Sequence, residues 1–123
     1  MNPVALWALT HILPFQVHVG TATTFDVPER DPWNNLGFAC EGRTKLTKLQ
    51  SLLVASGAIV AHKVLPCGTI ALICAPRLAR CALGVVWDRG PRRALFDLWH
   101  DLSELLKANG KEAVIAITWG GVN

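Results

Sequence analysis

The sequence contains no tyrosine and only one methionine, and aromatic residues make up 7% of its 123 residues. Charged residues are also scarce, at 17%, whereas hydrophobic residues reach 51%. A disordered chain has the opposite composition, with many charges and few apolar side chains. No linker rich in Pro, Gly or Ser divides the chain, and its length suits one hydrophobic core. We therefore expect a single folded domain.

Long runs of like charge are also absent. The net charge is +3, and the twelve Lys and Arg residues are spread from Arg30 to Lys111. Proteins that bind nucleic acid directly carry a basic stripe, in many cases interleaved with aromatic residues. The even spread of charge predicts a solvated surface and no direct recognition of nucleic acid.

No hydrophobic run is long enough to span a bilayer. The most apolar segment near a terminus is Val4 to Phe15, which contains His11 and Pro14 and has no basic residue before it. It is too short for a membrane helix, and it lacks the pattern of a standard export signal. We expect residues 1–15 to form an apolar arm that packs on a partner subunit or covers an edge of its own barrel, and residues 16–123 to form the domain.

The sequence has no Cys-x-x-Cys pair, and its four histidines show no ligand spacing with the cysteines. We therefore expect no structural metal and no cofactor. Two disulfides or free buried thiols are both compatible with four cysteines. Cys74 and Cys81 flank a predicted hairpin, where a bridge across the strands is possible. The other two cysteines are Cys40 and Cys67.

Short apolar runs alternate with turn residues along most of the chain. Alternation of apolar and polar residues with a period of two predicts strands, and recurrence every three or four residues predicts helices. The pattern indicates a mainly β protein with inserted helices and one long loop at 26–43. The predicted strands are 16–24, 58–61, 69–74, 82–87 and 112–119, and the predicted helices are 44–56, capped by Thr44, and 95–108.

Two motifs place groups capable of acid-base chemistry beside Gly/Pro turns at strand ends. The first is His-Lys-x-Leu-Pro-x-Gly-Thr at His62 to Thr69, and the second is Val-x-Asp-Arg-Gly-Pro at Val86 to Pro91. Loops held by a rigid scaffold commonly carry function. Together with Phe-Asp-Leu at Phe96 to Leu98, the motifs resemble the barrel of rare lipoprotein A and, more distantly, the first domain of expansins. Those proteins act on cell-wall glycans, and the resemblance implies a six-stranded double-psi β-barrel.

Asp88 and His62 are the candidate catalytic residues. Asp88 follows a strand and a large apolar ring, where desolvation would raise the pKa of its carboxyl and suit a general acid. The arginines that follow would lower that pKa, so Asp88 could instead cap a turn or pair with an arginine. His62 matches the histidine of the family motif and would orient Asp88 or bind a sugar; its alternative is a structural role.

Five further residues are candidates for substrate binding. Asp97 matches the aspartate of the family's Asp-Leu-Ser motif, although Trp99 stands where serine is expected. At the start of the predicted second helix, Asp97 could instead stabilise the helix end. The family's aromatic opening is reduced at Gly20 to Asp26, so Trp33, Trp87 or Trp99 would have to replace it in stacking on sugars. The five candidates are Lys63, Thr69, Trp87, Arg89 and Asp97.

Two functions remain open from the sequence. The expected one is a structural protein of a bacteriophage virion, at the tail or head-to-tail junction, which binds other virion subunits through residues 1–15. The alternative is an enzyme of the bacterial cell envelope or the virion, for which the resemblance implies lytic transglycosylase chemistry on peptidoglycan. Asp88 would then protonate the glycosidic oxygen, and its carboxylate would take a proton back from the sugar.

Overall fold

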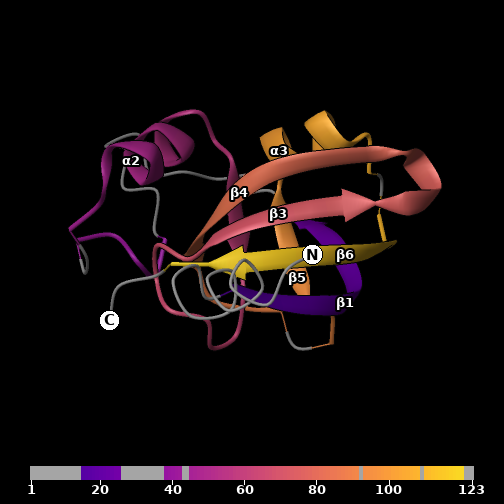
Figure 1. The fold of residues 1–123 in the computed structure, drawn as a ribbon, viewed down its shortest axis with the longest axis horizontal. Coiled ribbons are helices and arrows are strands. Elements are labelled where there is room, and N and C mark those ends of the chain that lie inside the picture. Colours follow the sequence, from indigo (N-terminus) through magenta and orange to yellow (C-terminus); the bar gives the residue numbers. More distant parts are fainter. Residues whose placement is uncertain (1–14, 26–37, 43–44, 92, 109, 121–123) are drawn as a thin grey trace, which may run out of the picture.

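The computed structural model describes residues 15–25, 38–42, 45–91, 93–108 and 110–120. Within them the protein is mainly β, with two short α-helices and one turn of 3-10 helix around a closed six-stranded mixed barrel (Figure 1). The mainly β prediction is therefore confirmed. The strands are β1 Phe15–Phe25, β2 Ile59–Ala61, β3 Ile70–Ala75, β4 Arg80–Asp88, β5 Phe96–Trp99 and β6 Glu112–Trp119. The helices are α2 Lys48–Ala55, η1 Pro76–Leu78 and α3 His100–Leu106.

The strand order around the barrel is β1-β5-β2-β4-β3-β6. β4 lies between β2 and β3, parallel to the first and antiparallel to the second. β1 lies in the same way between β5 and β6. The chain passes from β2 to β3, the two neighbours of β4, and later from β5 to β6, the two neighbours of β1. This repeated arrangement is consistent with the predicted double-psi barrel.

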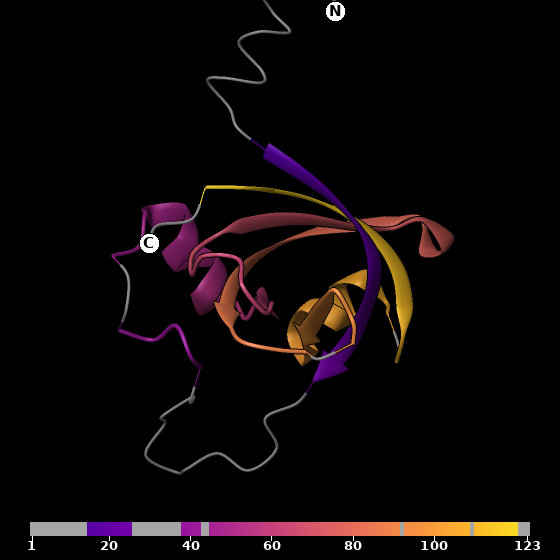
Figure 2. The ribbon, with the colours of Figure 1, turned by 90° about the horizontal axis from the view of Figure 1, so that it is seen from below.

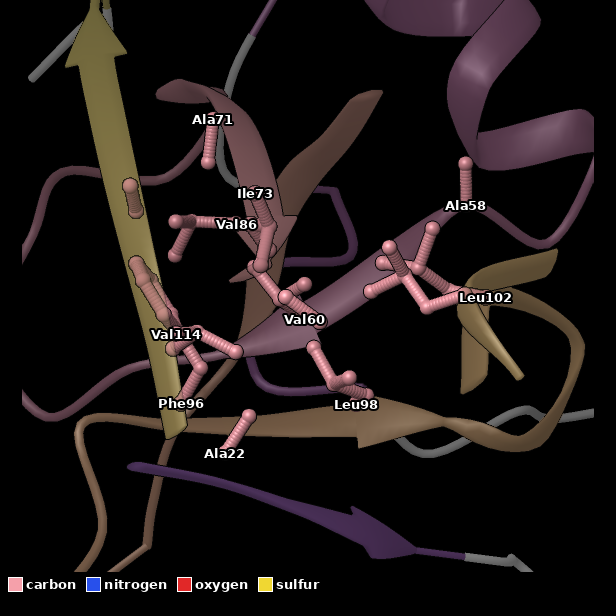
Figure 3. Packing of buried hydrophobic residues seen from close by; sticks show 13 residues of the cluster. Ala22, Ala58, Val60, Ala71, Ile73, Val86, Phe96, Leu98, Leu102 and Val114 are labelled. Atoms are coloured by element: carbon pink, nitrogen blue, oxygen red, sulfur yellow. The ribbon is translucent and has the colours of Figure 1, made fainter. Parts of the chain in front are cut away.

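Alternation along the strands fills the inside of the barrel with apolar side chains that range in size from alanine to Phe96 (Figure 3). On β6, for example, Val114 and Ala116 are buried while Ile115 and Ile117 are exposed. Leu102 and Leu106 of α3 join the same core. Burial of these side chains is the main source of stability for the barrel.

A second, smaller core lies outside the barrel wall, where Phe38, Cys40, Ile59 and Trp87 pack together. Helix α2 is on this side of the molecule, and the tip of the β3–β4 hairpin is on the opposite side (Figures 1 and 2). Val54 of α2 contacts the second core. The second core therefore attaches α2 and residues 38–42 to the barrel.

Helix α2 is shorter than the predicted helix 44–56. It begins at Lys48 because Thr47 is its N-cap, in a reciprocal capping box with Gln50. Such a box satisfies two backbone N–H groups that an uncapped helix leaves free. The predicted cap, Thr44, lies outside the described residues. Gln50 also donates through Nε2 to Gly68 O at 2.7 Å, which joins the helix to the loop between β2 and β3.

The prediction of one helix over 95–108 is wrong in its first part. Phe96–Trp99 is the strand β5, and the helix begins only at His100. Phe96 and Leu98 alternate into the core between β1 and β2, which overrides the helical spacing of the leucines. Asp97 therefore lies in a strand and not in the first turn of a helix.

Both pairs of cysteines form disulfides, Cys40 with Cys67 and Cys74 with Cys81. The second bridge joins directly paired residues of β3 and β4, as the hairpin prediction allowed. The alternative of free thiols does not hold. Strand β1 begins at Phe15, a residue predicted to belong to the arm, and the rest of that arm, residues 1–14, lies outside the described residues.

Candidate active site

Four residues on neighbouring strands form one row across the outside of the barrel. Thr23 of β1 pairs with Asp97 of β5, which pairs in turn with Ala61 of β2. Ala61 also pairs with Asp88 of β4. Both neighbours of Asp97 along β5 point into the core, so this row faces outward. With strands about 4.8 Å apart, the backbones of Asp97 and Asp88 are about 10 Å apart. We call these four residues the acidic row.

Asp97 has a partly buried carboxyl group with a defined hydrogen-bond partner. Its side chain is half-buried, and Thr23 Oγ1 donates a hydrogen bond to Asp97 Oδ1 at 2.7 Å. Burial raises the pKa of the Asp97 carboxyl, and the negative charge of Asp88 raises it further, against the opposing effect of the Thr23 hydrogen bond. Asp97 therefore keeps its proton to a higher pH than an exposed aspartate does.

Asp88 is held in a different environment. The backbone N–H of Ala39 donates to Asp88 Oδ1 at 2.9 Å, which fixes the carboxylate against residues 38–42. Its backbone O accepts from the N–H of His62 at 3.2 Å. The two residues that the motifs singled out, His62 and Asp88, are thus joined through their backbones at the ends of β2 and β4.

The ring of His62 is turned towards the barrel core. Its centroid lies 5.3 Å from that of Phe96 and 6.3 Å from that of His18. Nδ1 accepts from the N–H groups of Val64 at 3.1 Å and Leu65 at 3.0 Å. Nδ1 must be unprotonated to accept them, so the neutral ring carries its proton on Nε2. The imidazole therefore organises the turn that follows β2.

Burial lowers the pKa of His62, and the positive charges of His18, Arg89 and Lys63 lower it further. A protonated Nδ1 would also lose both backbone hydrogen bonds. The electrostatics and the geometry agree that His62 is neutral at pH 7. Its role in the structure is to shape the loop beside Asp88.

The Arg89 side chain also contacts this loop. Its Nη1 donates to His62 O at 3.2 Å and to Leu65 O at 2.7 Å, and its Nη2 contacts Cys67 Sγ at 3.4 Å. Thr69 ends the loop, and its hydroxyl donates to Pro66 O at 2.7 Å. These contacts hold the loop across the end of β4, where Asp88 lies.

The remaining candidates for substrate binding differ in exposure. Lys63 is exposed, whereas Thr69 and Trp87 are only 2% and 4% exposed. The Trp87 ring belongs to the second core, and its Nε1–H has no hydrogen-bond partner among the described residues. Trp99 is half-buried beside Phe38, with ring centroids 4.6 Å apart. Trp33 lies outside the described residues.

Three polar residues near these candidates, Thr23, His18 and Thr118, carry no motif that would have identified them in the sequence. Thr23 binds Asp97, and His18 Nε2 lies 2.8 Å from Thr118 Oγ1 while its ring faces His62. The signal for His18 was present in the alternation of 16–24, because His18 is four residues from the buried Ala22 and so faces inward with it.

Comparisons with known proteins do not place the chain in a family. No family model matches it, and no curated protein matches it. In the part of the chain that the structure describes, no three His, Cys, Asp or Glu side chains gather as a metal ion would require. No helix among the described residues has the length and apolar character needed to cross a bilayer.

Proposed function

We propose that the chain is a glycan-cleaving enzyme that acts on bacterial peptidoglycan through the acidic row. The observation that carries this proposal is the pair of carboxyl groups in unlike environments, Asp97 bound to Thr23 Oγ1 and Asp88 bound to a backbone N–H. A carboxyl group whose pKa is raised by burial and by a nearby carboxylate is a typical feature of acid-base sites. The substrate class rests on the resemblance of the two motifs to rare lipoprotein A.

Asp97 is the better candidate for the acid, in place of Asp88. In its protonated form it donates its proton to the glycosidic oxygen as the bond to the leaving sugar breaks. Its carboxylate then accepts a proton from a hydroxyl of the remaining sugar, whose oxygen closes the anhydro ring. This cycle returns the proton to Asp97 and consumes no water. The charge of Asp88 would favour the positively charged transition state.

The two disulfides suit an enzyme that works outside the cytosol. Disulfides form and persist in secreted proteins, in the bacterial envelope and on virion surfaces. One of them, Cys40–Cys67, joins the loop that contains His62 to the segment whose N–H binds Asp88. The proposed location is therefore the cell envelope or the surface of a virion.

A second candidate is a structural subunit of a bacteriophage tail or head-to-tail junction. The burial of Thr69 and Trp87 favours it, since two residues expected to contact glycan are not accessible. In this case the barrel would keep the geometry of an acid-base site without its activity.

Asp97→Asn tests the proposal, because the amide keeps the shape of the side chain but cannot donate and recover a proton. We expect purified wild-type protein to release anhydro-muropeptides from peptidoglycan, measured by mass spectrometry, and Asp97→Asn to be at least ~10²-fold slower. Glu104→Gln, which changes an exposed carboxylate on α3, is the matched control and should retain the wild-type rate.

Folding of the variant can be separated from its chemistry. A carboxyl whose pKa is raised in the folded state costs stability as pH rises through that pKa, so Asp97→Asn should be at least as stable as wild type at pH 7. Equal product release by both proteins would remove Asp97 from the mechanism. The absence of product from wild type would favour the structural subunit.

A further inference from the structure

The outside of the barrel has a second distinctive region, away from the acidic row. Strands β1 and β6 pair there over the whole length of β6, and their outward side chains are apolar and exposed. On β1 these are Phe15, Val17 and Val19, and on β6 they are Ile115 and Ile117. We call these five residues the uncharged face.

Charge is missing from this region even beyond those five residues. The next outward positions on β1 and β6 are Thr21 and Ala113, which pair with each other. Leu72 of β3 pairs with Ile117, and Leu83 of β4, which is also exposed, pairs with Leu72. A contiguous apolar surface of this kind is suited to contact with another apolar element of structure.

The area of the face limits the size of the element that could cover it. Four strands about 4.8 Å apart and about five residues long, at ~3.3 Å each, span roughly 300 Å². A stable interface between two proteins buries about 800 Å² on each partner. The face is therefore small for a dimer interface by itself, and it suits a short segment that is already tethered nearby.

Such a segment precedes β1 directly. Residues 1–14 include no Lys, Arg, Asp or Glu, and six of them are Val, Leu, Ile or Trp. Fourteen extended residues reach about 46 Å, more than twice the ~17 Å length of the face. The peptide bond to Phe15 keeps the segment at an effective concentration that a separate partner would match only at about millimolar levels.

We propose that residues 1–14 of the same chain cover the uncharged face. The contact joins the apolar side chains of the segment to the outward side chains of β1 and β6, and it requires no partner subunit. This inference is independent of the acidic row and of any activity.

Nuclear Overhauser effects between methyl groups of the full-length protein test the proposal. We expect cross-peaks between Val19 or Ile117 and residues 4–13 in a uniformly ¹³C-labelled sample. In a mixture of labelled and unlabelled protein, the filtered spectrum that detects contacts between chains should not contain them. Cross-peaks in that spectrum would overturn the proposal in favour of a second copy. Their absence from both spectra would overturn it by showing a bare face.

Two matched valines provide the mutational test. Val19 on the face is 77% exposed, and Val64 in the loop after β2 is 79% exposed. Val19→Lys should abolish the cross-peaks and lower the urea midpoint of unfolding by roughly 0.5 M, whereas Val64→Lys should change neither. Equal effects of the two substitutions would contradict a covered face.

Discussion

The two ends of β1 carry opposite kinds of outward side chain. Val17 and Val19, in the half paired with β6, belong to the uncharged face, whereas Thr23, in the half paired with β5, binds Asp97 in the acidic row. On the inward side of the same strand, Ala22 is buried in the core and the His18 ring lies beside Phe96. The comparison shows that a closed barrel fixes only one side of each strand and leaves the other side free to specialise.

Neighbouring loops account for the difference between the two regions. The acidic row lies beside the 62–69 loop, which Arg89, the His62 ring and the Cys40–Cys67 bridge hold in place. The uncharged face lies on a plain antiparallel ladder between β1 and β6. The acidic row thus lies next to a loop held by hydrogen bonds and a disulfide, whereas the uncharged face consists of regular strands.

Removal of the disulfides should cause the largest loss in the free energy of unfolding. One bridge lies beside each region, so the two losses can be compared. The Cys40–Cys67 bridge has a sequence separation of 27 and the Cys74–Cys81 bridge one of 7. Loop-closure entropy predicts losses of about 3.5 and about 2.4 kcal/mol for the corresponding double Cys→Ser variants. Urea unfolding measures both values. A larger loss for the hairpin bridge would contradict the predicted order.

Replacement of His62 should cause the next largest loss of stability, and its structural effect should be confined to the loop beside the acidic row. His62→Ala removes the acceptor of two backbone hydrogen bonds and should cost about 2 kcal/mol. His62→Asn should recover much of this loss, because an Asn oxygen accepts from the same backbone positions. If the two variants proved equally unstable, the ring would act only by filling space.

The pH dependence of stability offers a second measurement at this position. The pKa of His62 is lowered in the folded state, so the unfolded chain binds the proton first as pH falls. The stability that the neutral ring provides is present above about pH 6.5 and is lost as pH falls towards the folded pKa. Urea midpoints between pH 7.5 and 5 should fall in wild type and change less in His62→Asn.

Replacement of Thr23 should cause the smallest loss of stability. Together with the same replacement at Thr21, it compares the two parts of β1 directly. Thr23→Val removes the donor to Asp97, which should raise the pKa of Asp97 further and cost about 1 kcal/mol at pH 7. Thr21→Val, two residues earlier on the same outward side, should leave that pKa unchanged. Titration of the Asp97 carboxyl carbon by NMR measures the shift. An unchanged pKa in Thr23→Val would remove Thr23 from the site.

The sequence predicted more of the barrel than of the site. Period-two alternation identified β1 and β6, and the Gly/Pro turns bounded β3 and β4. It failed at Phe96–Trp99, where four residues of strand precede a helix and the leucine spacing continues through both. Short strands between two neighbours are stabilised by pairing and burial, which local spacing does not record.

The amino-acid sequence by itself determined the mainly β class, and its motifs identified Asp88, His62 and Asp97 as candidate site residues. Its high content of apolar residues also meant that some of them would occupy outward positions on the strands. Only the tertiary structure decided that Thr23 binds Asp97, that Ala61 separates the two carboxyl groups, and that Trp87 is buried. These contacts join residues up to 74 positions apart in the chain. They depend on strand register around a closed barrel, and register is set by the pairing of all six strands together.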